Sequence, residues 1–400
     1  MRDEHIVVVG GGIVGLAVAR QLLSTHDGLR LTVVEKEQQV AAHQTGHNSG
    51  VVHAGLYYPP GSRKAVLCRR GRPLLRDYCA TRGIPYVECG KLIVAREPSE
   101  LAALREIERR ARANGIPGLR WMEGAQLTEV EPAARGVAAV HSPRTAITDY
   151  PAIARALADD VRQMGGVVHL GTEVVGLATE PRRARVLTTA GEVTGDRLVI
   201  CAGLQSDRLA RRAGDDRYPI IVPFRGEYYR LAGERGDRIN GLIYPVPDPR
   251  YPFLGVHFTK RVDGSVDVGP NAVVGLSRED YRRGSVDTRD LWETLTSHGF
   301  RRLARRHWRV GLYEVRGSLS KRVFYQRARA YVDDLALEDL KPATAGIRAQ
   351  AVGRDGSLLD DFCINRTGPV ITVRNAPSPA ATASLAIAEH LAELIMGPSA

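Results

Sequence analysis

Cysteine is scarce in this sequence and never occurs as a Cys-x-x-Cys pair. The cysteines are odd in number, which argues against a disulfide framework, and their spacing matches no zinc site. We therefore expect a reducing compartment and no metal ion. The five cysteines are Cys68, Cys79, Cys89, Cys201 and Cys363.

Long apolar runs are also missing. No run approaches the roughly 20 residues that a helix needs to cross a bilayer. The chain passes from Met1 directly into a predicted strand at Ile6, which leaves no room for a charged leader, an apolar signal core and a cleavage site. The expected location is the cytoplasm, with a peripheral place on the inner face of a membrane as the alternative.

Basic residues are abundant but not concentrated. The formal net charge of +11 comes mostly from arginines spread through every segment, and no basic stretch is interleaved with stacking aromatics. Nucleic acid is therefore not an expected partner. With 400 residues, of which 44% are hydrophobic and 25% charged, the chain is long enough for two domains with sizeable cores.

A dinucleotide-binding fingerprint stands near the N-terminus. A β-branched run over 5–9 is followed by Gly10, Gly12 and Gly15 in the spacing G-x-G-x-x-G, and then by residues 16–23 with helical apolar periodicity. Gly10 permits a tight turn, Gly12 lets the backbone approach a pyrophosphate, and Gly15 lets the helix pack close to the strand. The free amides at the start of the helix then favour phosphate binding.

An acidic residue completes this fingerprint. A second β-branched run over 31–34 ends at Glu35, about twenty residues beyond the last glycine. A carboxylate at this place can accept hydrogen bonds from ribose hydroxyls and disfavours the 2′-phosphate of NADP. It does not separate FAD from NAD.

Two later segments look like returns to the same sheet. One has a helix over about 150–164 and a strand over 198–201, which meets Ala202 and Gly203 where backbone can approach a cofactor. The other has a strand over 370–373 and a helix over 380–395. These segments predict a discontinuous nucleotide-binding domain made of 1–89, 145–215 and 341–400, and a substrate domain made of 90–144 and 216–340.

Several longer strings carry a family resemblance. The sequence resembles the L-2-hydroxyglutarate oxidase/dehydrogenase family, which belongs with glycine oxidase, D-amino acid oxidase and glycerol-3-phosphate dehydrogenase among FAD enzymes. The resemblance covers nearly the whole chain. The strings are QTGHNSGVVHAGLYY from Gln44, CGKLIVA from Cys89, PFRGEY from Pro223, IYPVPDP from Ile243, GVHFT from Gly255, GPNA from Gly269, GIRAQ from Gly346 and RNAPSPAAT from Arg374.

The resemblance implies an α/β fold, with a Rossmann-like FAD-binding domain interleaved with an α+β substrate domain built on a mixed or antiparallel sheet. It also implies that 47–50 lines the flavin, with Asn48 and Ser49 donating hydrogen bonds and Gly50 permitting close approach. Amides near 380–382 would stabilise the reduced flavin. The full set of expected FAD-binding residues is Gly10, Gly12, Ile13, Val14, Gly15, Glu35, Lys36, Gln44, Thr45, His47, Asn48, Ser49, Gly50, Val174, Ala202, Gly203, Gly346, Arg348, Pro379, Ala380, Ala381 and Thr382.

The implied reaction is oxidation of L-2-hydroxyglutarate to 2-oxoglutarate, with quinone or oxygen taking the electrons from the flavin. This reaction needs a base for the hydroxyl proton and cations for the carboxylates. His53 and His257 are the candidate bases, because the ordinary pKa of histidine is near neutrality. Arg225 and Arg348 are the candidate carboxylate ligands. Weaker candidates for orienting the substrate are Tyr57, Tyr58, Lys91 and Tyr244.

Other interpretations stay open at this point. The same scaffold could serve an amino acid oxidase of the glycine type or a glycerol-3-phosphate dehydrogenase, a histidine such as His53 could hold the flavin covalently, and the basic chain could be a tRNA-related flavoprotein. The segment 300–309, with five arginines beside Leu303 and Trp308, resembles a basic amphipathic element that could rest on an anionic membrane and bring the flavin near a quinone. A solvated helix is the simpler interpretation of that segment.

Overall fold

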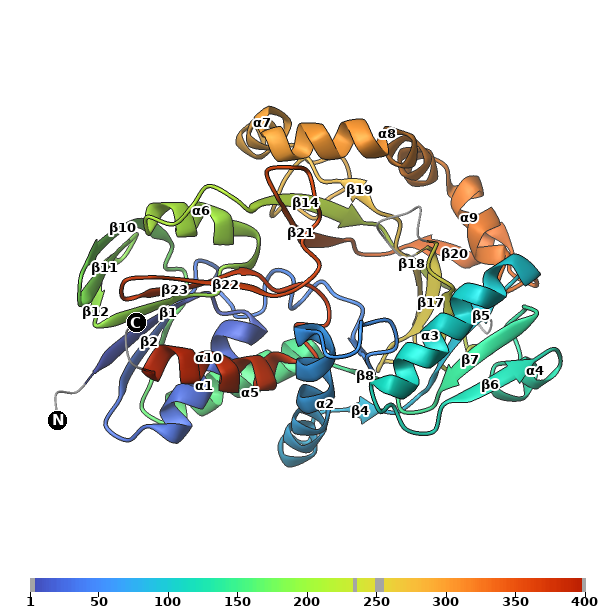
Figure 1. Cartoon of the computed structure of the whole chain (residues 1–400), viewed down its shortest axis with the longest axis horizontal. Helices are drawn as coiled ribbons and strands as arrows, with labels where there is room; N and C mark the ends of the chain where they lie inside the picture. Colours follow the sequence, from blue (N-terminus) through green and yellow to red (C-terminus); the bar gives the residue numbers. More distant parts are fainter. Residues whose placement is uncertain (1–3, 233–235, 249–254, 398–400) are drawn as a thin grey trace.

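The computed structural model describes residues 4–232, 236–248 and 255–397, so Pro249 of the IYPVPDP string lies outside the described residues. One part of the molecule is a six-stranded sheet with the order β22-β23-β13-β1-β2-β9, in which only β22 is antiparallel to its neighbour (Figure 1). The strands are β1 (His5–Val9), β2 (Arg30–Val34), β9 (Val167–His169), β13 (Arg197–Ile200), β22 (Cys363–Thr367) and β23 (Val370–Asn375).

Apolar layers cover both faces of this sheet. Helices α1, α5 and α10 pack together on one face, where Leu16, Leu157 and Leu391 belong to one buried cluster. The meander β10-β11-β12 packs on the other face through Val186. Burial on both faces explains why these strands are continuous β-branched runs. The covering elements are α1 (Ile13–Thr25), α5 (Tyr150–Gln163), α10 (Ser384–Met396), β10 (Val174–Glu180), β11 (Arg183–Thr188) and β12 (Gly191–Gly195).

The second part is an eight-stranded sheet with the order β20-β15-β18-β17-β16-β5-β7-β6. Its neighbouring strands are antiparallel except for β16 and β5, so this sheet is mixed, which is one of the two predicted arrangements. Its strands are β5 (Lys91–Ala95), β6 (Arg120–Glu123), β7 (Ala138–Ser142), β15 (Tyr229–Leu231), β16 (Leu242–Pro245), β17 (His257–Lys260), β18 (Val266–Gly269) and β20 (Leu340–Pro342).

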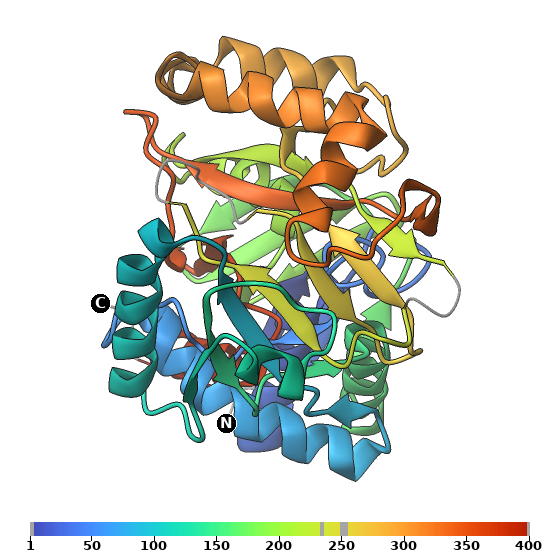
Figure 2. The ribbon, with the colours of Figure 1, turned by 90° about the vertical axis from the view of Figure 1, so that its right-hand side faces the viewer.

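Helices and short strands connect and cover the two large sheets. Figures 1 and 2 show α7, α8 and α9 along one edge of the molecule. No helix within the described ranges is both long and apolar enough to cross a membrane. The other α-helices and strands are α2 (Arg63–Arg82), α3 (Leu101–Ala113), α4 (Gln126–Val130), α6 (Ser206–Arg212), α7 (Thr288–Thr296), α8 (His298–Leu319), α9 (Lys321–Arg329), β3 (Val51–Val52), β4 (Tyr86–Val87), β8 (Ala146–Thr148), β14 (Ile220–Gly226), β19 (Val273–Val274) and β21 (Gly346–Val352).

The antiparallel pair β14 and β21 crosses the predicted domain boundary, because β14 was placed in the substrate domain and β21 in the nucleotide-binding domain. The predicted boundary between 340 and 341 also falls inside β20, and the division into domains stays a prediction. One helix start was wrong. The last helix begins at Ser384 and not at Ala380, because the chain first makes a tight turn in which the Ala380 amide donates to the Pro377 carbonyl at 2.9 Å.

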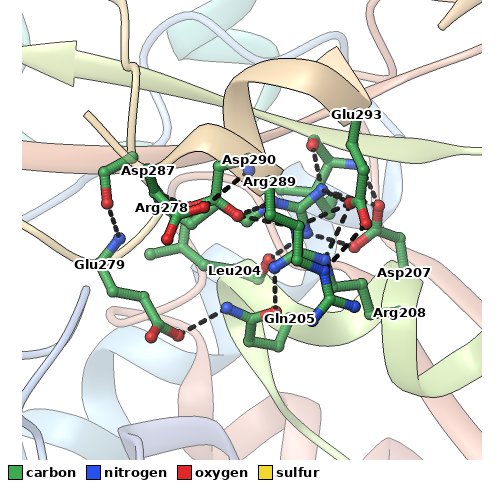
Figure 3. A network of polar contacts seen from close by, with 12 residues as sticks. Leu204, Gln205, Asp207, Arg208, Arg278, Glu279, Asp287, Arg289, Asp290 and Glu293 are labelled. Carbon is green, nitrogen blue, oxygen red and sulfur yellow. Dashed lines mark hydrogen bonds and ion pairs between the residues drawn. The ribbon is translucent and has the colours of Figure 1, made fainter. Parts of the chain in front are cut away.

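A buried network ties the segment before α7 to α6 (Figure 3). The Arg278 guanidinium is 2% exposed and donates to both carboxylate oxygens of Asp207, at 2.6 and 3.1 Å. It also donates to the carbonyls of Leu204 and Ile221, at 2.7 and 2.9 Å. Burial alone would raise the pKa of Asp207, but the Arg278 charge and its hydrogen bonds hold that pKa below its ordinary value. Both side chains of the pair are therefore charged, and both carboxylate oxygens of Asp207 accept hydrogen bonds.

We predict that Arg278→Met destabilises the protein by about 3–5 kcal/mol, because it leaves a buried carboxylate without its cation. The double variant Arg278→Met with Asp207→Leu should recover most of that loss, because the carboxylate that lost its cation is then also removed, while Asp290 keeps its ion pair with Arg208. The measurement is the free energy of unfolding in urea. A single variant as stable as the wild type would show that this ion pair does not hold the segment in place.

Candidate active site

The glycine turn after β1 has the geometry that its spacing predicts. Gly10 has a φ of +111°, and a Cβ at this position would lie 2.4 Å from the carbonyl oxygen of Cys201. A Cβ on Gly15 would lie 2.1 Å from the carbonyl oxygen of Gly10. Both contacts exclude any side chain, so β1, α1 and the end of β13 can meet only because these residues are glycine.

A cavity of about 920 Å³ extends from this turn to the eight-stranded sheet. Ligand cavities range from about 300 to 1,000 Å³, so this one suits a ligand as large as a dinucleotide. All the predicted FAD-binding residues line it except Gly15 and Gly50. Gly15 contributes through the packing of α1, whereas a Cβ on Gly50 would point at the Thr148 carbonyl, 3.1 Å away. The expectation that Gly50 makes room for the flavin was therefore wrong.

Glu35 is held in place at the end of β2. One carboxylate oxygen accepts a hydrogen bond from the Gly11 amide at 2.6 Å, and the other accepts one from the Glu37 amide at 2.9 Å. The side chain lines the cavity and is nearly buried. Because each carboxylate oxygen can accept a second hydrogen bond, Glu35 can still receive ribose hydroxyls.

The segment 44–50 turns tightly beside the cavity and uses some of its own polar groups. The Asn48 side chain donates to the Thr45 carbonyl at 2.7 Å and accepts from the Gly50 amide at 2.8 Å. Asn48 therefore shapes the turn, which differs from its expected role as a donor to the cofactor. The Thr45 hydroxyl accepts from the Ile13 amide at 3.1 Å, so this segment also caps the start of α1.

Two residues that the sequence analysis missed contact residues that line the cavity. Tyr281 stacks on His47 with ring centroids 3.7 Å apart and an angle of 11° between the planes. Glu279 forms an ion pair with Lys36 at 2.5 Å. It also accepts a hydrogen bond from Gln205 at 2.7 Å (Figure 3). The Arg278 network anchors residues 279–281. This segment has no periodic sequence pattern that could have predicted its position.

β21 also comes close to the segment 44–50. A Cβ on Gly346 would lie 2.6 Å from the carbonyl oxygen of His47, so only glycine fits. Arg348, two residues further along β21, lines the same cavity. Successive residues of a strand point to opposite faces, so Gly346 and Arg348 lie on the same face.

His257 lies at the far end of the cavity on β17. Its Nδ1 is 2.8 Å from the Gly255 carbonyl oxygen, and its ring packs against Tyr244 with centroids 3.9 Å apart. Because a carbonyl only accepts hydrogen bonds, Nδ1 carries the proton and Nε2 is left with a lone pair. Burial, followed by the charges of Lys91 and Arg348, lowers the pKa of His257 to about 3. His257 is therefore neutral at neutral pH.

His53 joins the same region to the C-terminal segment. Its backbone amide donates to the Thr382 hydroxyl at 3.1 Å, and its Nε2 is 3.3 Å from the Ser378 hydroxyl. The Thr382 hydroxyl in turn lies 3.0 Å from the Tyr150 hydroxyl. Burial, followed by the charge of Lys91, lowers the pKa of His53 to about 3. The segments 47–53 and 377–382 thus meet at one cavity, as the sequence analysis expected.

The predicted cations separate into two groups. Arg225 does not line the cavity; its guanidinium is paired with Glu227 at 2.5 Å and donates to the Arg282 carbonyl at 2.8 Å. In the register of β14 and β21, Phe224 pairs with Arg348. Arg225 therefore projects from the opposite face to Arg348, and its expected role as a substrate ligand was wrong.

Lys91 lies behind the lining and not in it. Its Nζ is 3.6 Å from the centroid of the Tyr244 ring and 5.3 Å from that of the Tyr57 ring, and both tyrosines line the cavity. Burial lowers the pKa of Lys91 to about 7. Tyr58 lines the cavity too, and so does Lys64, a cation that the sequence analysis did not single out.

Known proteins resemble this chain over nearly its full length. A family model for FAD dependent oxidoreductases matches residues 5–394. The L-2-hydroxyglutarate dehydrogenase of Indibacter alkaliphilus is 42% identical over 392 residues, which are 98% of each chain. The enzyme of that name from Escherichia coli K12 is 43% identical over 387 residues, covering 96% of this chain and 91% of the relative. The human mitochondrial L-2-hydroxyglutarate dehydrogenase is 42% identical over 405 residues, which cover 97% of this chain and 88% of the relative.

Solved structures share the fold at lower identity. The L-α-glycerophosphate oxidase of Mycoplasma pneumoniae, solved with FAD bound, superposes with a TM-score of 0.81 at 22% identity, covering 99% of this chain and 95% of the other. Glycine oxidase from Geobacillus kaustophilus superposes with a TM-score of 0.74 at 19% identity, covering 99% and 96%. The fingerprint, the cavity and these relatives agree: the chain belongs to the FAD-dependent oxidoreductases, in the L-2-hydroxyglutarate dehydrogenase family, and its cofactor is FAD.

Proposed function

We propose that the protein oxidises L-2-hydroxyglutarate to 2-oxoglutarate. The observation that carries the proposal is that one cavity joins the dinucleotide turn to a polar end where Arg348, Lys64 and two neutral histidines gather. This end offers cations to a dianionic acid and a base to its hydroxyl group. The names of relatives that are 42–44% identical over most of their length support the same substrate.

His257 is the base that we propose for the hydroxyl proton. Bound FAD supplies the hydride acceptor for the hydrogen at C2. The hydrogen bond to Gly255 fixes the tautomer that leaves Nε2 unprotonated, whereas the Nε2 of His53 already contacts Ser378. A substrate carboxylate brings negative charge into the site, raises the pKa of His257 and so helps its ring to hold the proton.

Arg348 is the proposed ligand of the carboxylate next to the reacting carbon. A guanidinium can grip a carboxylate through two parallel hydrogen bonds, which fixes the orientation of C2. Its charge also contributes to the low pKa of both histidines, which places it near them. Lys91 supports the site from behind Tyr57 and Tyr244, where its positive charge adds to the field that attracts a dianion.

We also propose that the edge formed by α7 and α8 contacts an anionic membrane, where a quinone would reoxidise the flavin. Trp308, Leu312 and Leu319 project from one side of α8, and the last of these is 76% exposed. Trp292 of α7 is 70% exposed. Apolar side chains flanked by arginines are typical of helices that lie in a membrane surface. The arginines of α8 are Arg301, Arg302, Arg305, Arg306, Arg309 and Arg316.

The substrate is tested by adding acids to the yellow protein under anaerobic conditions and following the flavin absorbance. L-2-hydroxyglutarate should bleach it rapidly, while D-2-hydroxyglutarate, glycine and glycerol 3-phosphate should bleach it slowly or not at all. Bleaching by glycine or glycerol 3-phosphate, with none by the L-hydroxy acid, would overturn the proposal.

The base is tested with His257→Gln. The rate of flavin reduction by L-2-hydroxyglutarate should fall by about 10²- to 10⁴-fold, the usual contribution of a general base. A matched control is His26→Gln, the half-buried C-cap of α1 outside the cavity lining, which should leave the rate unchanged.

The pH dependence of stability gives a second measurement on the same variant. The unfolded histidine takes up a proton below its ordinary pKa of 6.5, while folded His257 stays neutral until about pH 3. The wild type should therefore lose about 2 kcal/mol more unfolding free energy than His257→Gln between pH 8 and pH 5. Identical pH profiles would mean that His257 does not stay neutral in the folded protein.

The membrane contact is tested by flotation with vesicles that contain anionic phospholipid. The double variant Trp308→Ser with Leu312→Ser should float at least several-fold less than the wild type, because it removes two exposed apolar contacts and keeps every arginine. Leu187→Ser, which removes an exposed apolar side chain on β11, is the matched control. Equal flotation of all three proteins, or none by the wild type, would end this proposal.

A further inference from the structure

Lys64 is a buried cation at the start of α2. The Ser62 hydroxyl caps this helix by accepting from the Ala65 amide at 3.3 Å, which fixes the first turn and the direction of the Lys64 side chain. That side chain is only 6% exposed, yet it lines the cavity. An ammonium group loses its hydration on burial and needs a negative partner in return.

The partner that the structure gives it is Asp360. The Lys64 Nζ donates to the Asp360 carboxylate at 2.6 Å, and the Asp360 side chain is 87% exposed. The two members of the pair therefore differ in what separation would cost. Asp360 would return to full hydration, whereas Lys64 would be left charged and buried. Another carboxylate that enters the cavity can thus take the place of Asp360.

Contacts around Lys64 connect it to the proposed reaction site. Its Nζ lies 5.7 Å from the centroid of the Tyr58 ring, and the Tyr58 hydroxyl is hydrogen-bonded to Ser378. The Ser378 hydroxyl is 3.3 Å from the Nε2 of His53. The four side chains line the same cavity. Lys64 is therefore linked to His53 through two intervening side chains. The link consists of a cation–π contact with Tyr58 and hydrogen bonds through Ser378.

The charge of Lys64 acts on the same histidine as the charge of Arg348. Both contribute to the low pKa of His53, and they come from different elements, α2 and β21. A five-carbon diacid carries one carboxylate beside the reacting carbon and a second at its other end. If Arg348 takes the first, the second needs another cation that lines the cavity.

We propose that Lys64 binds the distal carboxylate of the substrate in exchange for Asp360, and that this exchange sets the preference for dicarboxylates over monocarboxylates. The inference rests on the proposed function and names a specificity-determining residue for it. Asp360 acts as an exchangeable counter-ion for Lys64 until the diacid arrives. A monocarboxylate of equal length has no distal carboxylate. It therefore leaves the ion pair between Lys64 and Asp360 intact and gains no binding energy from Lys64.

The test is a binding titration of the FAD-loaded protein, followed through the flavin spectrum, so no turnover is involved. The two ligands are 2-oxoglutarate and 2-oxopentanoate, which have equal chain length and differ in the distal carboxylate. For Lys64→Gln, Kd for 2-oxoglutarate should rise about 10- to 100-fold, because a charged hydrogen bond in a shielded site is lost. Kd for 2-oxopentanoate should change less than about twofold.

Asp360→Asn supplies an independent outcome, because it removes the competing carboxylate and leaves Lys64 in place. Its Kd for 2-oxoglutarate should fall, and its Kd for 2-oxopentanoate should not change. Lys64→Arg keeps the positive charge and should stay closer to the wild type than Lys64→Gln. Lys341→Gln, an exposed lysine of β20, is the control for general loss of charge.

The inference is overturned if Lys64→Gln weakens the binding of both ligands equally or of neither. It is also overturned if Asp360→Asn weakens the binding of 2-oxoglutarate. If Lys64→Gln does not fold, Asp360→Asn and Lys64→Arg still decide the question. Failure of the proposed function is a separate result, because it would appear as wild-type flavin that L-2-hydroxyglutarate does not bleach, whatever the titrations give.

Discussion

The site depends on backbone segments that approach one another without any side chain between them. At the dinucleotide turn, Gly10 meets the Cys201 carbonyl and Gly15 meets the Gly10 carbonyl, at distances that no Cβ could occupy. At the other side of the cavity, Gly346 meets the His47 carbonyl in the same way. These contacts hold α1, β13 and β21 at fixed separations. The width of the cavity between them is therefore fixed by close backbone contacts more than by side chains that can change rotamer.

Electrostatics at the polar end follow from the same close packing. Burial keeps His53 and His257 neutral, and the cations Lys91 and Arg348 reinforce this. The positive charges at this end of the cavity attract a dianionic acid, and neutral imidazole is the form that can accept a proton. One arrangement thus serves two needs of the reaction, because the groups that attract the substrate also keep the base unprotonated until the substrate arrives.

The sequence predicted the parts of the structure that repeat or that contain glycine at fixed spacing. The β-branched runs, the glycine fingerprint and Glu35 were found because strand burial and phosphate binding leave local patterns. Arg225 was misassigned because the choice between two faces of a strand depends on register, which Phe224 and Arg348 reveal only once β14 and β21 are paired. Tyr281 and Lys64 left no local signal, because one reaches His47 from a loop far along the chain and the other resembles any helix lysine.

The wall of the cavity is assembled from nearly the entire length of the polypeptide. Its lining residues run from Val9 to Thr382, whose hydroxyl accepts a hydrogen bond from the His53 amide. A ribosome synthesising this chain must therefore release almost all of it before the pocket has its final wall. The complete FAD pocket therefore forms only when nearly the whole chain has been synthesised, and until FAD binds, the side chains that line it face water.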